Sequence, residues 1–379
     1  MIEGARAHVF SGILCAVTLI AVWALCPKSG MRVNPLEIAV TVLLVFFAVG
    51  SAALSATPVS SGWRTFVIMA SGLGGYWSAR FLLHSVEARK LFVYFCSGLL
   101  LCVVSLIFIA LVQGAPGHIL LDVNPHPVCS RILMLSFAPM ALIATGGLIP
   151  LTAGAIMLMA AYIGLVAMLV WGQVSTAPIF PIILLFISCA FFWKSKKVRA
   201  VLLVLLMFAS IMTAIFAGRI QKDLPLDSQS FTYRYENLFF STHIAAEHPF
   251  FGIGARSPRE EYLDNYVVKH PLYTKEKFVE WTGVVRTSDN LPLSMLADFG
   301  FPFTLIYIAS VVWLTLLLVR SAWKKPANLF PHPLALLLPI LAIMMQSMIL
   351  DSIYHPHVSW FFHILIGLSF MNYTQGSAT

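Results

Sequence analysis

Residues 91–113 read LFVYFCSGLLLCVVSLIFIALVQ and contain no charged side chain. A helix needs about 20 mostly apolar residues to cross a bilayer, where its backbone must satisfy its own hydrogen bonds. Similar stretches recur along the 379-residue chain, which is 59% hydrophobic and 11% charged. This composition excludes a soluble globular protein and predicts an all-α, polytopic membrane protein.

Eleven stretches are long and apolar enough to be spans. Most ionisable side chains near them lie at span ends, which disfavours an ion-coupled carrier, since such carriers need charged groups at membrane depth. His363 is a polar exception inside a span, and we expect it to bond a neighbouring helix residue. The predicted spans are approximately 8–26, 36–56, 64–84, 91–113, 131–147, 150–171, 177–193, 200–217, 301–319, 333–350 and 357–373.

Basic residues gather in alternate connections between these stretches, and the positive-inside rule makes those connections cytoplasmic. The N-terminus is then outside, and the first span is a retained helix rather than a cleaved signal peptide. The net charge of +8 belongs to these connections, so we expect no nucleic-acid partner. The basic connections hold Lys28 and Arg32, Arg89 and Lys90, Lys194 to Arg199, and Arg320 to Lys325, and the loops at 57–63, 114–130, 218–300 and 351–356 lie outside.

One polar segment interrupts the apolar chain. Residues 219–299 hold eleven of the 16 acidic residues and nine of the 24 basic ones. The sequence therefore predicts three parts: a bundle of about eight spans at 1–217, an external polar segment at 218–300, and about three further spans at 301–379. Function is expected in the polar segment.

Helical spacing and capping residues predict a helix in this segment from Ser228 or Ser230 to about Glu247, ended by Pro249. Its apolar face is predicted to point to a membrane-facing core through Phe231, Tyr235, Leu238, Thr242 and Ala245. The sequence HPFFGIG follows at 248–254. It lacks the strand and third glycine of a dinucleotide loop, so we interpret it as a tight turn that brings Arg256 and Arg259 back over the helix.

Residues 286–300, RTSDNLPLSMLADFG, predict a short helix at the membrane surface before the span at 301–319. Ser288, Asp289 or Asn290 can cap this helix, and Gly300 closes it. A helix N-terminus binds anions, and Arg286 adds a fixed positive charge beside it. A phosphate or pyrophosphate head group therefore suits this end of the helix.

The early arginine, the HPxxGxG turn and the Asn-Leu-x-Leu run before a span together resemble bacterial O-antigen ligases and polymerases, over residues 228–320. The resemblance implies a GT-C-like membrane glycosyltransferase whose donor is a glycan on undecaprenyl pyrophosphate. It implies no nucleotide sugar, no cofactor and no metal ion. Arg234 matches the family's early arginine and Asn290 the asparagine of its motif, while Asp289 stands where the family usually has histidine.

Glycan transfer needs positive charge for the departing pyrophosphate and a base for the acceptor proton. We assign the pyrophosphate to Arg234, Arg256, Arg286 and Asn290, and the base to Asp289; Arg234 and Asp289 are the main catalytic candidates. The secondary candidates are His248 and Arg259. Alternatives remain open, since Asp289 also suits a helix cap and Arg234 a solvated surface position.

The leading hypothesis is a ligase-like enzyme in the bacterial inner membrane, with its long loop in the periplasm. Its partners are the polyprenyl-pyrophosphate glycan, a saccharide or lipid-core acceptor, and the bilayer. One alternative is a polymerase of the same family, which differs only in its acceptor. Two others are not enzymes: a lipid-oligosaccharide flippase, which the scarcity of charge within spans disfavours, and a scaffold for envelope synthesis.

Overall fold

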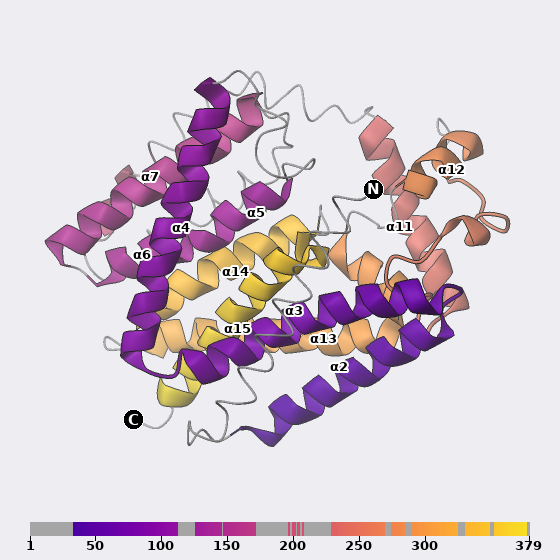
Figure 1. Cartoon of the computed structure of the whole chain (residues 1–379), viewed down its shortest axis with the longest axis horizontal. Helices are drawn as coiled ribbons and strands as arrows, with labels where there is room; N and C mark the ends of the chain where they lie inside the picture. The colour runs from indigo at the N-terminus through magenta and orange to yellow at the C-terminus, as the bar shows by residue number, and fades with distance from the viewer. Residues whose placement is uncertain are drawn as a thin grey trace. The chain divides into compact units, whose positions relative to one another are not determined.

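The described part of the chain consists of helices and of the turns and loops between them. The computed structural model describes residues 33–112, 126–145, 147–171, 196–197, 199–201, 203–204, 207, 229–269, 274–284, 290–324, 330–348 and 352–376. These residues form helices connected by turns, with no strand among them (Figure 1). The all-α prediction is confirmed for this part of the chain.

Four of the described helices are long and apolar enough to cross a membrane: Pro35–Leu54, Val86–Ile109, Leu148–Leu165 and Leu291–Ala322. Shorter apolar helical stretches cover Val128–Ala144, Pro333–Ser347 and Pro356–Met371. These helices support a multi-pass membrane protein. The predicted spans at 8–26 and 177–193, and nearly all of the span at 200–217, lie outside the described residues.

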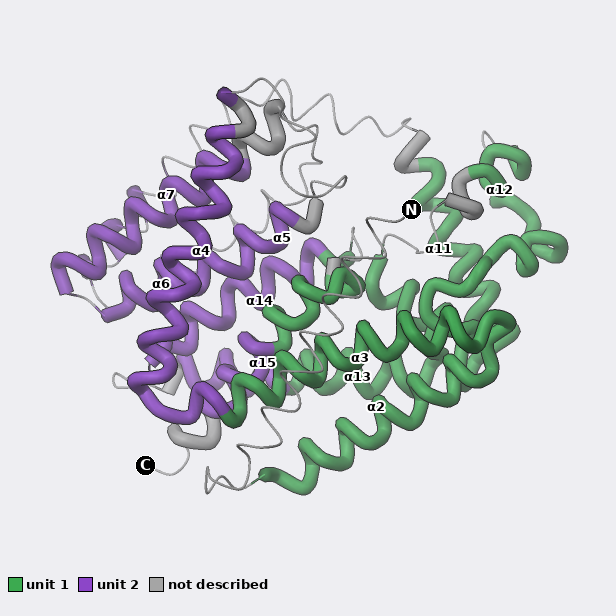
Figure 2. The backbone as a smooth tube through the Cα atoms, viewed as in Figure 1, with its two compact units in different colours: residues 1–81, 225–313, 347–363 green, residues 82–224, 314–346, 364–379 purple. Residues whose placement is uncertain are grey.

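The chain divides into two compact units, coloured separately in Figure 2. Unit 1 comprises residues 1–81, 225–313 and 347–363. It contains nearly all of α3, the first parts of α13 and α15, and most of the polar segment. Its helices are α2 (Pro35–Leu54), α3 (Pro58–Leu82), α11 (Gln229–Glu247), η2 (Glu260–Tyr262), α12 (Lys275–Val284), α13 (Leu291–Lys324), η3 (Ser352–Tyr354) and α15 (Pro356–Gly376).

Unit 2 comprises residues 82–224, 314–346 and 364–379. It contains the ends of α13 and α15 together with a set of apolar helices. These are α4 (Val86–Val112), α5 (His126–Leu135), α6 (Phe137–Ala144), α7 (Leu148–Trp171) and most of α14 (Pro333–Ser347).

A capping box and a buried ion pair fix the beginning of α2 in unit 1. The Asn34 side chain accepts from the Leu36 N–H at 3.0 Å, and Glu37 accepts from the Asn34 N–H at 3.0 Å. Glu37 also binds Arg80 of α3, with Arg80 Nε 2.8 Å from a carboxylate oxygen. The beginning of α2 is thereby tied to the end of α3.

Small residues of α3 allow α15 to approach closely. A Cβ at Gly75 would lie 2.1 Å from the Trp360 carbonyl oxygen, so this contact requires glycine. His363 of α15 donates through Nδ1 to the Ser359 carbonyl at 2.7 Å, and its Nε2 lies 3.2 Å from the Tyr307 hydroxyl. The prediction that His363 bonds a neighbouring helix residue is confirmed.

Some boundaries differ from the prediction. Helix α3 begins at Pro58, six residues before the predicted start at 64. The predicted span at 131–147 is two helices, α5 and α6, which meet at Ser136. Pro139 lacks the N–H that a continuous helix would need there, and the Ser136 hydroxyl donates to the Leu133 carbonyl at 2.5 Å.

The packing of α3 predicts a contrast between two glycines of the same helix. Gly75→Ala should lower the thermal unfolding midpoint in detergent, because overpacking against backbone costs about 1–3 kcal/mol or more. Gly62→Ala is the matched control, since a Cβ at Gly62 would meet nothing within 4 Å. Equal midpoints for the two variants would contradict the described packing.

Candidate functional site

The HPFFGIG turn completes the hydrogen bonding of a broken helix. Helix α13 leaves helical geometry at Gly300 (φ 82°, ψ 176°), and Pro302 has no N–H to give to the Asp298 carbonyl. The turn supplies the missing donors, with Ile253 N–H bonding the Ala297 carbonyl and Gly254 N–H bonding the Asp298 carbonyl, both at 2.9 Å. In return, Phe301 N–H donates to the Pro249 carbonyl at 2.7 Å. The turn and the break therefore form one structure.

Both glycines of the turn are required by conformation and by space. Gly252 has φ 64° and Gly254 has φ 94°, in the region that side chains disfavour. A Cβ at Gly252 would lie 2.5 Å from the Ala297 carbonyl oxygen, and one at Gly254 would lie 2.3 Å from the Ser61 hydroxyl. The turn interpretation of the GxG motif is confirmed, and the glycines serve close backbone approach.

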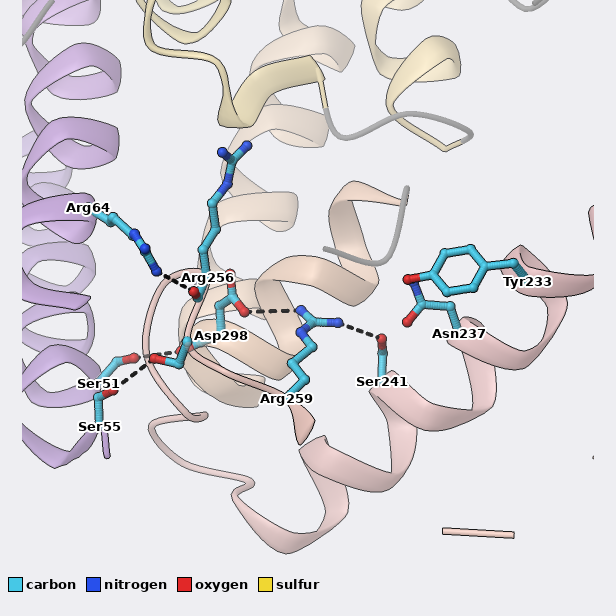
Figure 3. A network of polar contacts seen from close by, with 10 residues as sticks. Ser51, Ser55, Arg64, Tyr233, Asn237, Ser241, Arg256, Arg259 and Asp298 are labelled. Carbon is cyan, nitrogen blue, oxygen red and sulfur yellow. Dashed lines mark hydrogen bonds and ion pairs between the residues drawn. The ribbon is translucent and has the colours of Figure 1, made fainter. Parts of the chain in front are cut away.

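Asp298 is the polar centre of this structure (Figure 3). Its carboxylate binds the Arg259 guanidinium at 3.1 Å, and both side chains are 0% exposed. Arg259 also donates to the Ser241 hydroxyl of α11 at 3.2 Å. Arg259 therefore reaches back over the preceding helix, as predicted, and its described contacts support the turn.

The other Asp298 groups join the turn and α2. The second carboxylate oxygen accepts from the Arg256 N–H at 3.1 Å, and the Asp298 carbonyl accepts from the Ser51 hydroxyl at 2.5 Å. Ser55 and Ser257 are joined through their hydroxyls at 2.8 Å. At the end of α2, Ser51 therefore binds Asp298 of α13, and Ser55 binds Ser257 after the turn.

Arg256 occupies a conformation that is rare for its residue type. It has φ 49°, which for a residue with a side chain costs on the order of 1–3 kcal/mol unless its surroundings hold it. Its carbonyl accepts from the Arg64 guanidinium of α3. Its own guanidinium lies over the Tyr354 ring, 5.7 Å from the centroid, at a distance that permits a cation–π interaction. Figure 3 shows this side chain extending away from Asp298.

Asn290 caps α13. Its side-chain oxygen accepts from the Leu293 N–H at 3.1 Å, and its amide nitrogen donates to the Met348 carbonyl at 2.9 Å. Of the three predicted caps, Asn290 is therefore the observed one. The neighbouring candidates Asp289 and Arg286 lie outside the described residues.

Arg234 lies half-buried on α11, and His248 is exposed after the end of this helix, with its ring 5.3 Å from that of Tyr262. Asp298 thus binds the Arg259 guanidinium and the Arg256 backbone N–H, while the Arg256 guanidinium points away from it (Figure 3). Arg234 comes from a different element, α11, which contributes Ser241 to the same network.

The predicted apolar face of α11 is wrong. Of the residues predicted for this face, Tyr235, Leu238 and Thr242 are exposed, whereas Ala245 is buried. The buried face begins at Tyr233 and continues through Phe240 and Ile244, because these side chains pack on residues that follow the turn. This core consists of Tyr233, Phe240, Ile244, Ile253, Leu263, Tyr266, Phe278 and Ala297.

Polar residues on the same buried face bind later parts of the segment. Glu236 accepts from the Tyr266 hydroxyl and from the Lys269 N–H, both at 2.9 Å. Burial and the Glu236 carboxylate raise the pKa of Tyr266 above its ordinary value, so the phenol stays protonated and keeps donating. This bond fixes residues 266–269 on α11.

Sequence reasoning did not assign site roles to Asp298, Arg64 and Tyr354. A signal for Asp298 was present, because it stands four residues before Pro302 and its carbonyl therefore lacks a helical donor. Arg64 and Tyr354 gave no such signal. Their contacts depend on long-range packing of α3 and η3 within unit 1.

The buried ion pair predicts a stability effect. Asp298→Asn should lower the free energy of unfolding by about 3–5 kcal/mol, because the fully buried Arg259 guanidinium loses its counter-charge. Denaturant titration in detergent measures this loss. The exposed Asp264, as Asp264→Asn, is the matched control, and a similar small change in both variants would show that the pair is not structural.

Residues 130–308 match the model of the O-antigen ligase family. No curated protein matches the chain. The family match extends from α5 into the first part of α13 and includes α11, the turn, Arg259 and Asp298. The match covers slightly less than half of the 379 residues, and over this segment the chain is similar to O-antigen ligases.

Proposed function

We propose that the protein is an O-antigen ligase-like glycosyltransferase. It moves a glycan from undecaprenyl pyrophosphate to a saccharide or lipid-core acceptor. The family match supports a membrane glycosyltransferase of the ligase or polymerase type. The observation that carries the proposal is Arg256, a cationic residue held at φ 49° inside the matched segment. Strained residues of this kind gather at functional sites, because the surrounding structure pre-organises them.

Transfer proceeds by attack of the acceptor hydroxyl oxygen on the anomeric carbon, with inversion. The bond from that carbon to the pyrophosphate oxygen breaks, and its electron pair leaves with the pyrophosphate. Arg234, Arg256 and Arg286 neutralise this developing charge, because guanidinium groups match phosphate oxygens and stay charged. The helix end at Asn290 adds N–H donors, and the Asp289 carboxylate takes the acceptor proton.

The proposed architecture is GT-C-like, with eleven spans in the inner membrane. It has an N-terminal bundle at 1–217, a periplasmic catalytic segment at 218–300 and C-terminal spans at 301–379. The apolar helices support the membrane setting. The alternating basic connections support a periplasmic location for residues 218–300. No cofactor or metal ion has a role in the proposed transfer.

A polymerase of the same family is the second candidate, because it would use the same donor and the same charges. The two activities differ in the acceptor, which is a lipid-linked repeat for a polymerase and a lipid core for a ligase. Supplying each acceptor separately to the purified protein distinguishes them.

The test is transfer in proteoliposomes from a defined glycan on undecaprenyl pyrophosphate. Arg234→Ala, Arg256→Ala and Asp289→Ala should each reduce transfer on the order of a hundredfold, because each removes positive charge or the base. Lys275→Ala, which removes an exposed charge from α12, is the control and should retain wild-type transfer.

Two outcomes would contradict the proposal. Near-normal transfer by all three variants would remove the site assignment. The wild type could also fail to transfer the glycan to either acceptor. At matched protein amounts and with donor present in the same leaflet, this failure would favour a non-enzymatic scaffold.

A further inference from the structure

The backbone on both sides of Arg256 is held by charged side chains. On one side, the Arg256 N–H donates to the Asp298 carboxylate at 3.1 Å. On the other side, the Arg256 carbonyl accepts from Arg64 Nη1. Hydrogen bonds to charged groups are stronger and more directional than neutral ones. Together they hold Arg256 at φ 49°, a conformation that it would otherwise leave.

The two anchors come from different parts of unit 1. Asp298 lies on α13 and is itself fixed by the buried Arg259 guanidinium. Arg64 lies on α3 near Ser61 and Thr65, which are buried at 0% and 4% exposure. A Cβ at Gly254 would lie 2.3 Å from the Ser61 hydroxyl, which shows how closely the turn approaches this face of α3.

The backbone conformation sets the direction of the Arg256 side chain. Its guanidinium lies 5.7 Å from the centroid of the Tyr354 ring, and Tyr354 is 2% exposed. An arginine held over an aromatic ring loses less conformational freedom when it binds an anion, because its planar group is already restricted. Because the backbone conformation sets this direction, a shift of the Arg256 backbone at its carbonyl would move the guanidinium.

We infer that Arg64 is a positioning residue, which acts on the donor pyrophosphate through Arg256. This inference rests on the proposed function, and it adds to the site a residue that lies outside the segment matched to the family. Arg64 fixes the carbonyl of Arg256 and so aims the Arg256 guanidinium.

Two rival roles make different predictions. If Arg64 bound the pyrophosphate itself, the losses from Arg64→Ala and Arg256→Ala would multiply in the double variant. If Arg64 served only to stabilise the fold, its removal would lower the amount of folded protein while the folded fraction kept normal kinetics.

The first measurement is a kinetic cycle with proteoliposomes that contain the full chain and a polyprenyl-pyrophosphate glycan. Arg64→Ala should lower kcat/KM on the order of ten- to a hundredfold, because small misplacement of a binding group has effects of this size. Arg64→Lys should recover part of the loss, since it restores a charged donor without the planar fork. In the Arg256→Ala background, Arg64→Ala should change kcat/KM less than about threefold.

The second measurement is hydrogen exchange of the same proteins without substrate. Exchange of the amides in residues 252–257 should accelerate in Arg64→Ala, while peptides within α11 should keep wild-type rates. Arg320→Ala, which removes an exposed arginine from the far part of α13, is the control for both measurements and should match the wild type.

Multiplicative losses, normal kcat/KM for Arg64→Ala, or unchanged exchange of residues 252–257 would each overturn the inference. A different result would count against the proposed function instead. If Arg256→Ala transferred normally, Arg256 would have no role in transfer, and the exchange data would still show whether Arg64 holds the turn.

Discussion

The carbonyl oxygen of Asp298 has no donor within its own helix, because the residue four positions later is Pro302 and the chain departs from helical geometry at Gly300. A buried carbonyl must find a partner elsewhere. It finds two, the Gly254 N–H of the turn and the Ser51 hydroxyl of α2. This requirement docks the turn on α13, where the Arg259 guanidinium and the Arg256 N–H bind the carboxylate of Asp298.

The positions of the basic residues follow from this docking. Arg259 is buried and pairs with Asp298, whereas the Arg256 guanidinium lies over the Tyr354 ring. Two arginines three residues apart therefore have different surroundings. A fully buried, paired arginine maintains the structure, and a half-buried arginine in a strained backbone is the better candidate for binding an anion.

Local patterns predicted much of this fold. The α11 boundaries, the cap at Asn290, the break at Gly300 and the glycine turn all depend on capping, proline and glycine chemistry within a few residues. The prediction of the buried face of α11 was wrong because two faces of that helix carry aromatic residues. Long-range packing on Tyr266 and Phe278 decides which face is buried. Arg64 could not be predicted as a partner of Arg256, since 192 residues separate them. Asp289 and Arg286 stay predictions, as they lie outside the described residues.

In the proposed function, the turn presents Arg256 to a pyrophosphate at the membrane surface. The most direct measurement is an experimental structure of the protein with undecaprenyl pyrophosphate bound in a lipid nanodisc. We expect a phosphate oxygen within hydrogen-bond distance, about 3 Å, of the Arg256 guanidinium, with Arg64 still bonded to the Arg256 carbonyl. A pyrophosphate bound elsewhere, with Arg256 unchanged over Tyr354, would contradict the account.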